Sequence, residues 1–288
     1  MNSKGTLLTN LYLKGGGDPS LGPKGIASLA AAVRRSGIKS IPGKIVGDDG
    51  FFDRIRGIPA LGGIDPYQGG LLGGLAYNHT GSAKAAASAF TLALRSAGVL
   101  VPKGHTIVGT APYASVHVAR HESLPASTLI RLTNVWSDNF YAEMLTKALG
   151  AIKLRSGSTE SGLKAAASVL AKLGVRPIRA DGSGISRRNR TSARTVQRLL
   201  GAMAANQPFI DSLPVAGVSG TLANRMRGTA AHRRCHAKTG TLSNMSALAG
   251  YCFTAKGRTI SFALLMNYID VWTARFRQDR IVSALAAG

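Results

Sequence analysis

The 288-residue sequence predicts a mixed α/β (α+β) fold, and three observations support that class. Apolar residues recur at helical spacing in several segments that end at glycines. Two segments, 232–239 and 246–254, flank a turn-rich stretch and indicate a β-hairpin, and the strongly apolar segment 259–267 indicates a further strand. With 45% hydrophobic residues, the chain can bury one good core and a smaller second one.

The part before about residue 115 is broken by glycine-rich turns into short pieces. Two helices are predicted there, over 24–36 and 82–97, because their apolar residues fall on one side. The segment 38–46 is predicted as a strand that Pro42 interrupts.

From about residue 116 the pattern is more regular and predicts one continuous α/β unit. Ser137 is a suitable N-cap for a helix over 138–149, and Gly150 is placed to end it. The other helices predicted here cover 159–173, 191–204 and 270–286.

The charge balance is strongly basic, with 36 Lys and Arg against 13 Asp and Glu, a formal net charge of +23. Such a chain attracts anionic partners. Nucleic acid is not expected, because the arginines are scattered, aromatic residues make up only 6%, and no zinc finger or RNP motif is present. A solvated basic surface without a specific role and contact with an anionic cell envelope both remain open.

Neither a membrane span nor a signal peptide is predicted within these residues. No stretch reaches the roughly 18 uncharged apolar residues that a span needs, and Met1–Lys4 leads into Gly-Thr without an apolar signal core. The only cysteines, Cys235 and Cys252, flank the predicted hairpin and could lie opposite each other. Two buried free thiols are the favoured state, and a disulfide is the alternative in an oxidising compartment.

Two short motifs suggest chemistry. Lys238-Thr239-Gly240, followed by Thr241, on an edge strand would supply an ammonium and hydroxyls for a substrate carboxylate, and its glycine would let a peptide backbone approach. Ser137-Asp138-Asn139 at a helix start would present a hydroxyl that can relay a proton and an amide that can hold a peptide. Alone, either motif fits an ordinary strand or N-cap. Together they are two of the three motifs of penicillin-binding serine acyltransferases.

The order of further blocks makes the resemblance specific. Asp181–Arg187, Leu213–Gly217 with Gly220-Thr221-Leu222, and Leu11–Pro19 occur in the expected order around the two motifs. With these blocks the sequence resembles the D-alanyl-D-alanine carboxypeptidase/endopeptidase family, the low-molecular-mass class C penicillin-binding proteins of the peptidase S13 type.

The resemblance implies a transpeptidase/β-lactamase-like antiparallel sheet flanked by helices, with an inserted small domain. Residues 1–115 would be the inserted region and 116–288 the catalytic domain. Members cut the D-Ala-D-Ala bond of peptidoglycan stem peptides, or a cross-link, through an acyl-serine that penicillin and other β-lactams also form. Extracytoplasmic action, in the periplasm or cell envelope, is implied as well.

Carried over by motif, Ser137 would be the proton relay, Asn139 the substrate and lysine anchor, and Lys238 the partner of the substrate carboxylate. Thr239, Gly240 and Thr241 would line the substrate site. The third motif, Ser-x-x-Lys with the nucleophile, has no counterpart before Leu11–Pro19, so we expect a chain truncated at its N-terminus.

Three serines fit part of a nucleophile motif but are placed wrongly for it. Ser36–Lys39 lies at a helix end in the inserted region, Ser161–Lys164 follows Ser-Asp-Asn, and Ser183 lies in a predicted turn without an accompanying His/Asp pair. His117 and His121, like His232 and His236, are four apart, but both pairs lie in predicted strands or turns. No metal ion and no cofactor is therefore predicted.

Besides the enzyme, two function classes stay open. A non-catalytic peptidoglycan-binding protein would keep Lys238 and Thr239 to hold stem peptides without cutting them. A nucleic-acid-binding protein, the less favoured class, would need only the positive charge.

Overall fold

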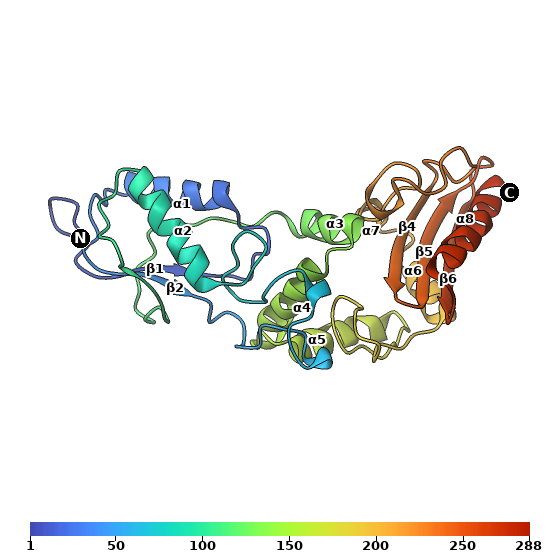
Figure 1. Ribbon diagram of the computed structural model, residues 1–288, viewed down its shortest axis with the longest axis horizontal. Coiled ribbons are helices and arrows are strands. Elements are labelled where there is room, and N and C mark those ends of the chain that lie inside the picture. Colours follow the sequence, from blue (N-terminus) through green and yellow to red (C-terminus); the bar gives the residue numbers. More distant parts are fainter. The chain divides into compact units, whose positions relative to one another are not determined.

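A computed structural model describes residues 1–288 and divides them into two compact units (Figure 1). The first unit comprises Met1–Leu124 with Glu143–Ala165, and the second comprises Pro125–Ala142 with Ala166–Gly288. Each unit contains a three-stranded sheet of its own. The family-based boundary near residue 115 stays a prediction.

The sheet of the first unit is parallel, which the sequence did not reveal. Its strands are β1 (Leu11–Lys14), β2 (Ile45–Asp48) and β3 (Thr106–Val108), in that order. The predicted strand over 38–46 begins only at Ile45, beyond Pro42, since proline has no N–H for the pairing. Strands of three or four residues are too short to show a recognisable alternation in the sequence.

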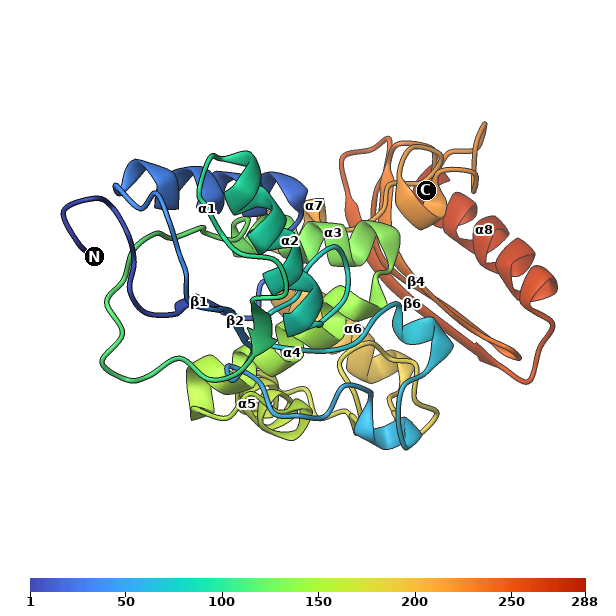
Figure 2. The same cartoon turned by 60° about the vertical axis from the view of Figure 1, so that its left-hand side comes forward.

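Two helices pack over this parallel sheet, α1 (Pro23–Arg35) and α2 (Ala83–Ser96), and they confirm the predictions for 24–36 and 82–97. They lie side by side over β1 and β2 in both views (Figures 1 and 2). Their inward apolar residues, Ile26, Val33, Phe90 and Leu94 among them, form one buried cluster with the strands. Two short 3-10 helices, η1 (Pro59–Leu61) and η2 (Pro66–Gln68), occupy the intervening loop.

Helix α4 (Asn139–Leu154) is longer than predicted, because Gly150 does not end it. A Cβ at Gly150 would lie 2.6 Å from the backbone nitrogen of Gly162, at the start of α5 (Thr159–Lys172). The glycine therefore permits close packing of α4 on α5. Helix α5 itself confirms the prediction for 159–173.

The second unit is built on an antiparallel sheet of β4 (Cys235–Leu242), β5 (Met245–Phe253) and β6 (Thr259–Asn267), as predicted. Helix α8 (Val271–Ala287) packs on one face and α6 (Ala193–Met203) on the other. Alternation along β5 explains both layers, since Leu248 and Cys252 join the cluster with α8 while Tyr251 joins the one with α6. The remaining helices are α3 (Ala126–Trp136), which was not predicted, α7 (Gln207–Asp211) and η3 (Gly220–Leu222).

Cys235 and Cys252 lie directly opposite each other across β4 and β5, as predicted from the hairpin. They form a disulfide, so the favoured interpretation as free thiols is wrong. Their position explains the bond, because directly opposite residues of a non-hydrogen-bonded antiparallel pair have the closest side chains. No helix of the structure has the length and apolar character needed to cross a bilayer.

Candidate active site

Lys238 lies in the middle of β4, opposite Ala249 of β5. Its side chain is on the strand face away from the disulfide, which it shares with His236. His236 packs edge-on against Phe253, with ring centroids 5.5 Å apart. The pairing of β4 with β5 therefore fixes the residues before and after Lys238 in the strand.

The Lys238 ammonium has two hydrogen-bond partners in the second unit. Its Nζ donates to Ser137 Oγ at 2.6 Å and to the carbonyl of Thr239 at 2.7 Å. Both acceptors are uncharged, and no carboxylate lies within ion-pair distance. Burial without a counter-charge lowers the pKa of Lys238 to about 8. The two motifs are 101 residues apart in sequence, and a hydrogen bond between Lys238 and Ser137 joins them. The Lys238 ammonium has no negatively charged partner there.

Ser137 is presented differently from the prediction. It is the C-terminal cap of α3, with a left-handed backbone at φ 56°, and it is not the N-cap of the following helix. Asp138 takes that role, because its Oδ1 accepts the backbone N–H of Tyr141 at 2.9 Å. The Ser137 hydroxyl is thereby left to Lys238. Asn139 is the first residue of α4 and is half-buried.

One half of the outer edge of β4 is covered and the other half is open. The backbone N–H of Ala237 donates to Pro214 and that of Ala216 donates to the Cys235 carbonyl, both at 2.9 Å. This alternation directs the backbone groups of Thr239 and Thr241 to the same outer side, where no strand pairs with them. Residues 239–241 therefore offer an open edge for an extended peptide.

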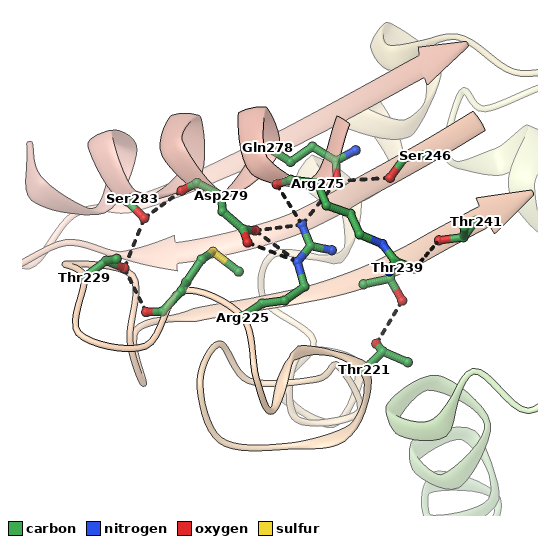
Figure 3. Close-up of polar contacts among 11 residues, drawn as sticks. Thr221, Arg225, Thr229, Thr239, Thr241, Ser246, Arg275, Gln278, Asp279 and Ser283 are labelled. Carbon is green, nitrogen blue, oxygen red and sulfur yellow. Dashed lines mark hydrogen bonds and ion pairs between the residues drawn. The ribbon is translucent and has the colours of Figure 1, made fainter. Parts of the chain in front are cut away.

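The hydroxyls of Thr239 and Thr241, on this open edge, form hydrogen bonds to residues of η3 and α8 (Figure 3). Thr239 Oγ1 donates to Thr221 Oγ1 of η3 at 2.8 Å, and Thr241 Oγ1 accepts from Arg275 Nη2 of α8 at 3.2 Å. Because Arg275 has no proton acceptor to offer, the Thr241 hydroxyl must direct its own proton elsewhere.

A second set of contacts fixes the loop that carries Thr221 (Figure 3). Arg225 forms an ion pair with Asp279 of α8 at 2.7 Å and donates to Gln278 Oε1 at 3.2 Å. Gln278 Oε1 also accepts from Ser246 Oγ of β5, and both of these side chains are buried. Thr221, Arg225 and Arg275 are residues that sequence reasoning did not assign to the site. Only the resemblance of the Gly-Thr-Leu block pointed near them.

None of the three serines considered as nucleophiles hydrogen-bonds to the Lys238 ammonium. Ser36 caps α1 and Ser161 lies in α5, both in the first unit, whereas Ser137 and Lys238 belong to the second. Ser183 lies in the predicted turn, which is confirmed: the Asp181 carboxylate accepts the N–H groups of Gly184 and Ser186. The site as described contains the Ser137 hydroxyl and the Lys238 cation.

Comparison with known proteins gives a consistent result. The model of the D-Ala-D-Ala carboxypeptidase 3 (S13) family matches residues 1–67 and 74–287. A D-alanyl-D-alanine carboxypeptidase of Actinomadura sp. (strain R39) is 41% identical over 193 residues, 62% of this chain and 35% of that protein. The D-alanyl-D-alanine carboxypeptidase DacB of Haemophilus influenzae is 31% identical over 173 residues, 57% of this chain and 36% of that protein. The chain thus spans about a third of the length of these curated relatives.

Solved structures show the same fold. Penicillin binding protein 4 (dacB) from Haemophilus influenzae superposes with a TM-score of 0.79 at 22% identity, covering 100% of this chain and 84% of that one. Bd3459, a predatory peptidoglycan endopeptidase from Bdellovibrio bacteriovorus, superposes with a TM-score of 0.59 at 20% identity, covering 96% and 76%. These likenesses confirm the predicted mixed α/β class.

Proposed function

Because the chain belongs to the D-Ala-D-Ala carboxypeptidase 3 (S13) family, we propose that the Lys238 site binds the D-Ala-D-Ala end of peptidoglycan stem peptides for serine-type carboxypeptidase or endopeptidase chemistry. The observation that carries the proposal is the half-buried Lys238 ammonium, which hydrogen-bonds to Ser137 Oγ and has no anionic partner. A desolvated cation of this kind favours a ligand carboxylate. The periplasm or cell envelope is the proposed place of action.

The ligand would lie along the open half of the β4 edge. Its backbone would pair with the outward N–H and C=O groups of Thr239 and Thr241, as an added antiparallel strand. Its terminal carboxylate would accept hydrogen bonds from Lys238 and from the Thr241 hydroxyl, whose proton is directed away from Arg275. Gly240 lies exposed between the two threonines and leaves room for the peptide.

In the proposed reaction, a serine oxygen attacks the carbonyl carbon of the penultimate D-Ala. The serine O–C bond forms, the peptide C–N bond breaks, and the proton from the serine reaches the leaving amine through the Ser137 hydroxyl. Water then hydrolyses the acyl-serine. Asn139 is proposed to hold the substrate amide. The attacking serine and its lysine are not identified among the residues of the site, so catalysis by this chain depends on a nucleophile still to be located.

A non-catalytic peptidoglycan-binding role is the second candidate. It is favoured by one observation: the site joins Ser137, Thr239 and Lys238, and neither Ser36 nor Ser161, the serines followed three residues later by lysine, hydrogen-bonds to the Lys238 ammonium. Such a protein would hold the stem peptide and release it uncut. Intact mass after incubation with benzylpenicillin distinguishes the two roles, since only a nucleophilic serine forms a covalent adduct.

Binding of an N-acyl-D-Ala-D-Ala peptide tests the shared part of both roles. We expect Lys238→Ala to weaken binding about tenfold or more, the range for a lost charged hydrogen bond, and the peptide carboxamide to bind as poorly. Lys256→Ala, which removes the same charge from an exposed lysine, is the matched control. Equal losses in both variants, together with a steep salt dependence, would instead indicate diffuse attraction of anions, as in nucleic-acid binding.

A further inference from the structure

The C-terminal helix α8 exposes an aromatic and basic surface on the side away from the sheet. Its buried residues, Ala274, Gln278, Val282 and Ala286, follow one another at intervals of four and pack toward β5. The exposed surface, here called the α8 outer face, consists of Trp272, Phe276, Arg277 and Arg280. Trp272 is 77% exposed and Phe276 61%, and Tyr268, just before the helix, is 91% exposed. Rings this exposed on consecutive turns contribute nothing to the core.

The cations of this face are not neutralised by the acidic residues of the helix. Asp270 caps the helix by accepting the N–H of Thr273, and Asp279 is paired with Arg225 on the inner side (Figure 3). No ion pair involves Arg277 or Arg280. The Arg280 guanidinium lies over the Phe276 ring, 5.7 Å from its centroid. Apolar rings and unpaired positive charge therefore share one surface.

We propose that the α8 outer face docks on a membrane surface that contains anionic phospholipids. The outer side of a helix is convex, so it cannot enclose a small molecule. A lipid interface satisfies both groups, because rings enter the boundary between headgroups and acyl chains while arginines meet phosphates. The contact is interfacial, since the inner side of α8 is committed to the sheet. It does not depend on peptide binding at Lys238.

Vesicle co-sedimentation tests the docking. The full chain is expected to bind phosphatidylglycerol-containing vesicles and to bind phosphatidylcholine vesicles much less. Replacing both rings, Trp272→Ser with Phe276→Ser, is expected to weaken binding about tenfold, because each ring buries part of its apolar surface in the interface. Loss of two cations, Arg277→Gln with Arg280→Gln, is expected to have an effect of about tenfold as well.

The matched control removes the same charge from another exposed helix surface. Arg194→Gln with Arg198→Gln, on α6, gives an identical net charge and is expected to bind nearly as well as the wild type. If this control is weakened as much as the α8 pair, or if the double aromatic variant binds like the wild type, the attraction is a diffuse effect of the whole +23 chain and the proposal is overturned.

Tryptophan fluorescence provides a readout that charge alone does not move. The chain has two tryptophans, and docking predicts a blue shift of emission on adding anionic vesicles that disappears in Trp272→Phe although that variant still binds. Preferential, ring-dependent binding to purified peptidoglycan would assign the face to the wall polymer and overturn the lipid assignment. Dimers that form without vesicles and are lost in the double aromatic variant would assign it to a second copy.

Discussion

Two regions of this protein withdraw a lysine from water, Lys147 completely and Lys238 in part, and their surroundings differ in whether they supply a counter-charge. In the first unit, Lys147 of α4 is 1% exposed, and its Nζ donates to Asp53 Oδ1 at 2.5 Å and to the Ile55 carbonyl at 3.1 Å. In the second unit, Lys238 of β4 meets only a serine hydroxyl and a carbonyl. A buried lysine with a counter-charge is destabilised strongly when its partner is removed, whereas a lysine without one costs stability and is consistent with a ligand that supplies the anion. The comparison separates a structural cation from a candidate binding cation.

The largest expected effect is at the structural lysine. Asp53→Asn keeps the side-chain shape but leaves the Lys147 ammonium buried without its counter-charge, so we expect the free energy of unfolding to fall by about 3 kcal/mol or more. Urea denaturation followed by circular dichroism measures this. The double variant Asp53→Asn with Lys147→Met removes the stranded charge and is expected to recover part of the loss. A single variant as stable as the wild type would show that Lys147 is not held by this pair.

At Lys238 the expected change in the free energy of unfolding has the opposite sign. Lys238→Met removes a half-buried cation without a counter-charge, so the variant is expected to be more stable than the wild type at neutral pH. The gain is at most about 3 kcal/mol, which corresponds to a pKa lowered from 10.5 to about 8.

This gain depends on pH in a defined window. The folded chain binds fewer protons at Lys238 than the unfolded chain between pH 8 and 10.5, so wild-type stability rises with pH there. The advantage of Lys238→Met is therefore complete below pH 8 and disappears toward pH 10.5. Parallel denaturation series of both proteins across this range measure the difference. A constant difference would mean that the Lys238 charge is as well solvated in the folded state as in the unfolded one.

The sequence predicted the elements around Lys238 better than the contacts that make it a site. A strongly apolar segment predicted β6 at 259–267, and the hairpin pattern placed Cys235 opposite Cys252. The apolar character of one segment and the positions of two residues on either side of a turn are local features of the sequence. They can therefore be recognised without knowledge of the fold. The redox state of the two cysteines is not such a signal, and it was predicted wrongly.

Long-range polar pairs left no trace in the sequence. Lys147 and Asp53 are 94 residues apart, and Arg225 and Asp279 are 54 apart, so no spacing rule connects them. The prediction of the N-cap residue of α4 was wrong for a different reason. Ser137 and Asp138 are both good N-cap residues, and the left-handed turn that selects Asp138 depends on how α3 ends. Neighbouring residues of equal propensity are distinguished only by tertiary structure.

The smallest expected effect concerns two arginines that connect the β4 region with α8, Arg225 from the loop after η3 and Arg275 from α8 itself. Arg225 is mostly buried and pairs with Asp279, so Arg225→Ala is expected to cost about 2 kcal/mol of unfolding free energy. Arg275 makes one exposed contact to Thr241 and lies over the Trp272 ring, and Arg275→Ala is expected to cost less than about 1 kcal/mol. The same denaturation assay ranks them. If Arg275→Ala proved the more destabilising change, Arg275 would be a structural support of α8, and its hydrogen bond could no longer be interpreted mainly as orienting the Thr241 hydroxyl toward the open strand edge.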